Sequence, residues 1–300
     1  MNLYFLLPIL YVLLADVRSI EAISFGRSDI DYCEEKSTKI QMVLALDRTG
    51  TFRNSYQKIF ESVYRDLINA VEKKYPGSQF SVVAFSDYDQ ASTPLDGGTG
   101  RAEYREEWCY QVIEKFVMSA QVISEAIGHI EQGYGWNNGG ESSLTATLFA
   151  AADKTLGWIT EPVDPTDGKT VRKIIVLATD ETSTRKLGKQ GVRQPPKGDG
   201  TDKCATTLPP NDAILEKTLK DNDISVIGLY TPRSSEAENG IYIDLLEYYN
   251  NIFGRMGIEY NQYVLDTSST NKIIENLLTG ISNTVECEEE DPPAYNTLGL

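Results

Sequence analysis

Short hydrophobic runs alternate along the chain with longer amphipathic stretches. Four of these runs are too short for a helix and lack polar alternation, which predicts strands buried on both faces of a sheet. They are Ile40–Leu46, Phe80–Phe85, Ile174–Ala178 and Ile224–Tyr230. Two weaker runs, Tyr110–Phe116 and Tyr263–Asp266, predict strands at the edges of the sheet.

Helical periodicity fills the segments between these strands. The predicted helices are Tyr56–Val71, Ala120–Ile130, Leu144–Leu156, Ala213–Leu219, Tyr242–Ile252 and Asn271–Val285. Such alternation is typical of right-handed crossovers and of a mostly parallel sheet with helices on both faces. The sequence therefore predicts a doubly wound, open α/β sheet that forms one domain over residues 33–287. Ligands of such folds bind beyond the carboxyl ends of the strands, where the strand order reverses.

The two ends of the chain differ from this pattern. Leu3–Ala15 is uncharged and apolar but too short to span a bilayer comfortably, so residues 1–22 are predicted to be a secretory signal peptide. Residues 288–300 begin as an acidic run and are predicted to be disordered. We expect an extracellular protein, or one of a secretory organelle, without a direct membrane span.

Composition limits the classes of partner. The chain has 41% hydrophobic and 24% charged residues, as a globular protein does, and its 28 Lys and Arg against 44 Asp and Glu give a net charge of −16. A broad phosphate-binding surface is therefore not expected, which excludes nucleic acid as a partner. Cations, or basic and neutral surfaces, suit this charge better.

Four cysteines in an exported protein predict two disulfides, with three possible connectivities. Cys33 precedes the first strand and Cys287 follows the last helix. Because chain ends are often adjacent in compact domains, we expect these two to pair, which leaves Cys109 and Cys204. Free, buried thiols are the alternative.

Oxygen-bearing side chains follow the first predicted strand. Asp47, Thr49 and Thr51 leave it on a turn, where alternate side chains can converge on a hard cation such as Mg²⁺. Turn and helix-cap chemistry is the alternative interpretation. Asp180 ends another strand, and Glu141 lies in a glycine- and asparagine-containing loop. Three carboxylates at one edge repel each other unless a cation or protons lie among them.

These residues resemble the metal-ion-dependent adhesion site of von Willebrand factor A domains, and most closely that of the I-like domain of integrin β subunits. Asp47, Thr49 and Thr51 match its Asp-x-Ser-x-Ser motif with both serines replaced by threonine. The resemblance implies that Thr49, Thr51 and Glu141 ligate Mg²⁺ or Mn²⁺ directly, while Asp47 and Asp180 act through water. It covers nearly all of residues 38–285.

The resemblance also implies a second metal site and a loop disulfide. Asp87, Asn138, Gly140 and Glu141 correspond to a second site in β subunits, which Ca²⁺ would occupy. A bond between Cys109 and Cys204 would tie two loops beside the first metal.

The resemblance implies adhesion and no enzymatic activity. The partner would be an extracellular or cell-surface protein that presents Asp or Glu to the metal, and an α-like subunit or a membrane-anchored partner would hold the protein at a surface. A basic loop that includes Arg185, Lys186 and Lys189 follows Asp180. It is either a solvated loop or a surface that attracts anionic partners toward the ion.

Two other classes of function are alternatives. Residues 47–51 are similar to the Asp-x-Asp-Gly-Thr motif of haloacid-dehalogenase-like phosphatases, but Thr49 replaces the Asp that acts as general acid. The other alternative is a structural extracellular matrix module that has the fold and no metal.

Overall fold

The computed structural model describes residues 37–86, 109–131, 142–183, 211–232, 243–265 and 269–285. The predicted signal peptide, the acidic tail and Cys33, Cys204 and Cys287 lie outside these ranges. The boundaries proposed for the domain and the signal peptide stay predictions.

Within the described ranges, six strands form one sheet in the order β3-β2-β1-β4-β5-β6. Their bounds are β1 Thr38–Asp47, β2 Gln79–Phe85, β3 Gln111–Val117, β4 Thr170–Thr179, β5 Ile224–Tyr230 and β6 Tyr260–Val264. All neighbours are parallel except β2 and β3, which are antiparallel. Both weak strands lie at the edges, which confirms the prediction. The fold is doubly wound and Rossmann-like, as the resemblance to von Willebrand factor A domains implies.

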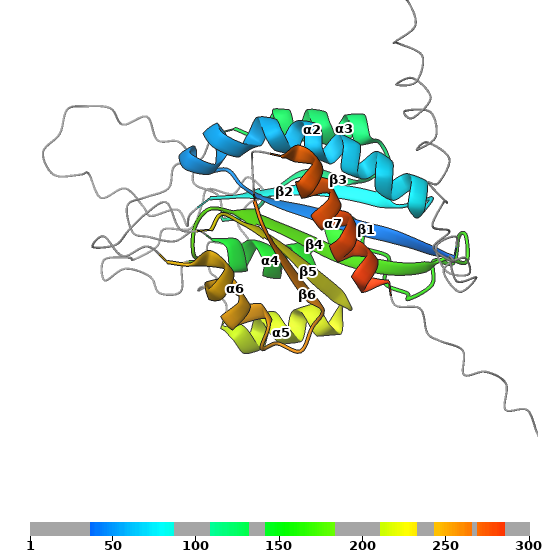
Figure 1. The fold of residues 1–300 in the computed structure, drawn as a ribbon. Helices are drawn as coiled ribbons and strands as arrows, with labels where there is room; N and C mark the ends of the chain where they lie inside the picture. The colour runs from blue at the N-terminus through cyan, green and yellow to red at the C-terminus, as the bar shows by residue number, and fades with distance from the viewer. Residues whose placement is uncertain are drawn as a thin grey trace, which may run out of the picture.

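Helices cover both faces of the sheet (Figure 1). Alternate residues of β1 explain this, since Met42 and Leu44 pack in one hydrophobic cluster and Val43 and Ala45 in the other. The first cluster includes buried side chains of α2 Gly50–Lys74, α3 Ala120–Gly128 and α7 Thr270–Thr284. The second includes buried side chains of α4 Ser143–Ala152, α5 Asp212–Asp221 and α6 Leu245–Phe253. Every residue of β1 is buried, as its unbroken hydrophobic run predicts.

Several predicted boundaries were wrong, including that of β4, which begins at Thr170 and not at Ile174, and that of α6, which begins at Leu245 and not at Tyr242. The first helix begins at Gly50, six residues before the predicted Tyr56, because its first turn carries few apolar residues besides the buried Phe52. The segment predicted as one helix to Leu156 breaks at Asp153, whose carboxylate accepts a hydrogen bond from the Thr155 amide at 2.9 Å and starts a separate 3-10 turn. The last strand begins three residues earlier than predicted, at Tyr260, and ends two residues earlier, at Val264.

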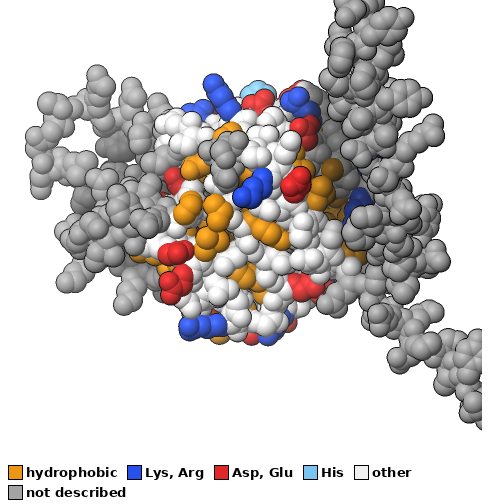
Figure 2. Space-filling view, in the orientation of Figure 1, with side chains coloured by type: hydrophobic (Ala, Val, Ile, Leu, Met, Phe, Trp, Pro, Cys, Tyr) orange, Lys and Arg blue, Asp and Glu red, His pale blue; other side chains and the backbone are white. Residues whose placement is uncertain are grey.

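The surface seen from the side of Figure 1 mixes all types of side chain. Figure 2 shows acidic, basic and hydrophobic side chains interspersed on this face. The acidic side chains therefore do not form one continuous negative patch on this face. Within the described ranges, no helix has the length and apolar character that a membrane span requires.

Candidate metal centre

The strand order reverses between β1 and β4, so the centre of the sheet is its topological switch point. These two strands pair in parallel as far as Leu46 opposite Ala178, and both end at the same edge. Asp47 is the last residue of β1 and Asp180 follows β4 directly. The structure thus brings these two predicted site residues to one edge.

Asp47 is fixed at this edge by two hydrogen bonds. Its Oδ1 accepts one from the Thr49 amide at 2.8 Å, and its Oδ2 accepts one from the Thr179 hydroxyl at 2.7 Å. The residue is only 3% exposed, and this burial raises the pKa of its carboxyl group to about 6. Both hydrogen bonds lower the pKa, whereas the nearby Glu181 charge raises it further. A cation at this edge would offset the cost of burying the charge.

Thr49 occupies the N-cap position of α2 but its side chain makes no capping hydrogen bond. Its Oγ1 is buried and has no hydrogen-bond partner among the described residues. The hydroxyl lies near the Asp47 carboxylate and lowers its pKa, although the geometry is not that of a hydrogen bond. Even a hydrogen pointed at Asp47 would leave both lone pairs of the oxygen without a donor.

Other N-cap side chains of the described helices behave differently. Four of them accept a hydrogen bond from a backbone amide in the first turn, as N-caps usually do, namely Ser119, Asn211, Asp244 and Ser269. The exceptions are Thr49 and Ser142, which begin α2 and α4. Helix capping therefore does not explain why a threonine stands at position 49.

Two further acidic residues follow β4 and are buried. Asp180 is 4% exposed and Glu181 is 3% exposed. Burial, and next the Asp180 charge, raise the pKa of Tyr56 in the second turn of α2. The adjacent ends of β1 and β4 and the start of α2 thus carry three buried carboxyl groups and the buried Thr49 hydroxyl.

The start of α4 is attached to the same edge. The Ser142 amide donates to the Ser86 carbonyl at 2.8 Å, and the Ser142 hydroxyl donates to the Cys109 carbonyl at 2.9 Å. Ser86 follows β2, so this contact joins the segment after Glu141 to the end of the strand beside β1. Glu141 itself lies outside the described residues.

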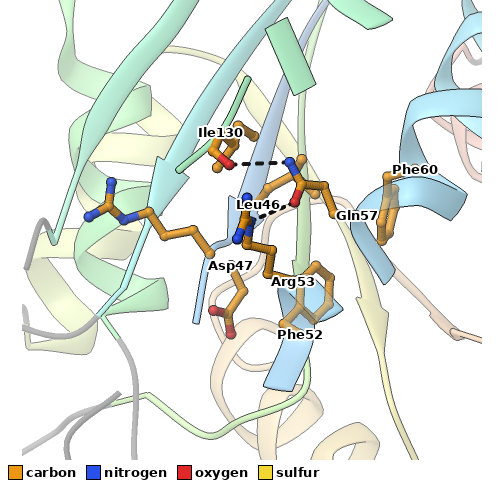
Figure 3. Close-up of a pocket in the computed structure, with 8 residues that line it drawn as sticks. Leu46, Asp47, Phe52, Arg53, Gln57, Phe60 and Ile130 are labelled. Atoms are coloured by element: carbon orange, nitrogen blue, oxygen red, sulfur yellow. Dashed lines mark hydrogen bonds between the residues drawn. The ribbon is translucent and has the colours of Figure 1, made fainter. Parts of the chain in front are cut away.

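A small pocket lies beside Asp47, between the end of β1 and the start of α2 (Figure 3). The Arg53 side chain turns toward Gln57 and donates a hydrogen bond to its Oε1 at 2.8 Å. Gln57 in turn donates to the backbone carbonyls of Ile127 and Ile130. The Asp47 carboxylate points away from Arg53 in this view.

Several predicted residues cannot be placed. Thr51 is the second residue of α2, and its side chain is not described. The remaining predicted members of the two metal sites and the basic loop lie outside the described residues, namely Glu141, Asp87, Asn138, Gly140, Arg185, Lys186 and Lys189. Within the described ranges, no group of three or more His, Cys, Asp and Glu side chains is arranged to hold a metal.

Cys109 is the one cysteine within the described ranges. It is buried and disulfide-bonded. Its partner is one of the other three cysteines, all outside these ranges, so both predicted pairings stay predictions.

Sequence reasoning missed two residues that contact the site. Thr179 donates to Asp47 across the strand pair, and Glu181 influences the Asp47 pKa. Position gave a signal for both, since each directly flanks Asp180 at the end of a central strand. The residue types gave no signal, because neither a threonine nor a glutamate by itself marks a site.

Comparisons with known proteins add a similarity in fold. The structure is similar to that of proximal thread matrix protein 1 from the mussel byssus, with a TM-score of 0.48 and 15% sequence identity. The match covers 83% of this chain and 48% of that one, so it spans about half the length of the mussel protein. No protein-family model and no curated protein matches the sequence. An identity this low does not transfer a function.

The described residues are of the chemical type that a hard divalent cation prefers. Asp47 and Asp180 would supply carboxylate oxygens and Thr49 would supply a neutral, buried hydroxyl oxygen. An all-oxygen set of this kind suits Mg²⁺ or Mn²⁺ and does not suit a zinc site, which needs nitrogen or sulfur.

Proposed function

We propose that the protein is a secreted ligand-binding module that binds a carboxylate of a partner protein through a divalent cation. The cation would be Mg²⁺ or Mn²⁺, held by Asp47, Thr49, Thr51, Glu141 and Asp180. The buried Thr49 hydroxyl, which makes no hydrogen bond to any described residue, is the observation that carries this proposal. Keeping such a group buried costs about 1–3 kcal/mol unless something else binds it.

The residues have separate tasks in this proposal. Thr49, Thr51 and Glu141 would contact the ion, while Asp47 and Asp180 would hold water molecules around it. The bound ion supplies positive charge for a carboxylate oxygen of the partner. Thr179 and the Thr49 amide orient Asp47, because each donates a hydrogen bond to a different oxygen of it.

The partner would be an extracellular or cell-surface protein that presents Asp or Glu. An α-like subunit or a membrane-anchored protein would retain the module at a surface. The basic loop with Arg185, Lys186 and Lys189 would attract an acidic partner toward the ion. The second site at Asp87, Asn138, Gly140 and Glu141 would take Ca²⁺.

The variant Thr49→Val tests the proposal directly. Valine keeps the shape of threonine and removes the oxygen, so we expect the Kd for Mg²⁺ to rise at least tenfold, about 1.4 kcal/mol. Stability in a chelator should stay the same or increase slightly, because no hydrogen bond to a described residue is lost. Calorimetric titration gives the first quantity and urea unfolding gives the second.

Thr284→Val is the matched control. Thr284 is also buried, but it lies at the end of α7 and its hydroxyl donates to the Ile281 carbonyl at 2.8 Å. This variant should lose stability and keep its Mg²⁺ affinity. Equal Mg²⁺ binding by wild type and Thr49→Val would contradict the proposed role of Thr49, and no Mg²⁺ binding by either protein would favour a metal-free matrix module.

A further inference from the structure

Two consecutive tyrosines of α6 contact both segments that flank the metal centre. The Tyr249 hydroxyl donates to the Glu181 carbonyl at 2.8 Å and lies 2.9 Å from the Ser143 hydroxyl. The Tyr248 hydroxyl donates to the Ser183 carbonyl at 3.0 Å and accepts from the Ser183 amide at 3.3 Å. α6 therefore links the segment after Asp180 to the first residue of α4.

A direct contact closes this network. The Leu144 amide of α4 donates to the Ser183 hydroxyl at 3.2 Å. Residues 181–183 and 143–144 thus contact each other and also share the two tyrosines of α6. Burial raises the pKa of Tyr249 well above its usual value, so its hydroxyl keeps its proton and can donate.

Aromatic packing fixes where these hydroxyls point. The Tyr249 ring stacks on Tyr230 of β5, with 4.2 Å between centroids and 11° between planes, and it meets Tyr248 edge-on at 89°. Tyr230, Tyr249 and Phe253 are completely buried, and Phe253 continues the stack toward Tyr260 of β6. A ring held on both sides has little rotational freedom, so its hydroxyl can set the position of the segment to which it bonds.

We infer that Tyr248 and Tyr249 are positioning residues for the metal centre. They hold the Glu181–Ser183 segment against the start of α4, and this sets the position of Asp180 relative to the first turn of α4. Neither tyrosine contacts the ion in this arrangement. The inference rests on the proposed function, because it concerns how well the same site is organised for the cation.

Removing one hydroxyl at a time tests this inference. Tyr249→Phe keeps the stacked ring and loses only the bonds to Glu181 and Ser143, so we expect its Mg²⁺ affinity to fall about fivefold, the worth of one buried hydrogen bond. Tyr248→Phe should have a smaller effect, because Tyr248 is only half-buried. Calorimetric titration of Mg²⁺ into the full chain measures both changes.

Tyr260→Phe is the matched control. Its hydroxyl belongs to the same aromatic stack and donates to Gln262 at 2.8 Å, yet no bond joins it to residues 181–183. The Tyr260→Phe variant should lose about as much stability as Tyr249→Phe and keep the Mg²⁺ affinity of wild type. An unchanged affinity in Tyr249→Phe, or an equal fall in Tyr260→Phe, would overturn the inference.

Hydrogen exchange in the presence of a chelator gives a readout that does not depend on the metal. The Ser183 amide should lose protection about fivefold in Tyr248→Phe and should be unchanged in Tyr260→Phe. Equal protection in all variants would mean that the tyrosines do not hold the segment. If wild type fails to bind Mg²⁺, the proposed function fails and the inference falls with it. Binding by wild type with no effect of Tyr249→Phe overturns the inference alone.

Discussion

The variant Asp47→Asn is expected to lose the stabilisation that Mg²⁺ gives to the wild type and to remain folded. In the wild type, Mg²⁺ at a hundred times its Kd should raise the free energy of unfolding by about 2.7 kcal/mol. Asparagine is neutral and cannot supply the charge that holds the ion and its waters. It keeps an oxygen to accept from the Thr49 amide, and the Thr179 hydroxyl can rotate to accept from its amide group.

Without metal, the Asp47→Asn variant should not be less stable than wild type. Burial of the Asp47 carboxylate raises its pKa to about 6, which means that the charged form is disfavoured in the folded protein. The neutral variant should therefore be at least as stable as wild type in a chelator. Thermal unfolding followed while Mg²⁺ is added to both proteins measures the two effects together.

Asp221→Asn controls for the change in net charge. Asp221 is exposed on α5, where it forms an ion pair with Lys217, far in sequence from the metal centre. This variant should keep the full Mg²⁺-dependent stabilisation. If Asp47→Asn is stabilised by Mg²⁺ as much as wild type and Asp221→Asn are, the cation does not bind at the end of β1.

The sequence was sufficient for the sheet because burial on both faces leaves a simple pattern. Strand β1 contains only buried residues, and its hydrophobic run located it to within two residues. The same logic predicted that Asp47 and Asp180 share one edge, because parallel strands end on the same side. The pairing of Leu46 with Ala178 and the bond from Thr179 to Asp47 confirm this adjacency.

The surroundings of the site depend on contacts that have no local sequence pattern. The first turn of α2 was predicted as a turn, and nothing local shows that the Thr49 side chain leaves its capping role unused. In the sequence, nothing distinguishes Tyr248 and Tyr249 from other residues of an amphipathic helix. Their contacts to Glu181 and Ser183 join positions more than sixty residues apart, which periodicity cannot reveal.

A glycine inside β5 makes the aromatic stack possible. Gly228 lies two residues before Tyr230 on the same strand face, and the tyrosine ring folds back over it. A Cβ added at Gly228 would lie 2.3 Å from Tyr230 Cε2 and 2.4 Å from its hydroxyl. Glycine usually weakens a strand, so its presence here indicates a close approach by another group.

Gly228→Ala is therefore expected to destabilise the protein by about 2–3 kcal/mol, the cost of overpacking a close-packed core. The Tyr230 ring has to move, but Tyr249 stacks on it at 4.2 Å and leaves no room on that side. Urea unfolding measures the loss. Gly128→Ala is the control, since its nearest neighbour would be the Glu61 side chain at 3.6 Å, an ordinary contact, and it should be nearly neutral.

A double variant separates the clash from any intrinsic effect of alanine in the strand. Tyr230→Ala alone creates a cavity and should cost about 3–5 kcal/mol. Because the ring that the added methyl group would strike is then gone, combining Gly228→Ala with Tyr230→Ala should cost almost nothing more. Additive losses in the double variant would contradict the steric explanation. If the stack also positions Tyr249, Gly228→Ala should weaken Mg²⁺ binding as well, which would connect the packing of β5 to the proposed metal centre at the end of β1.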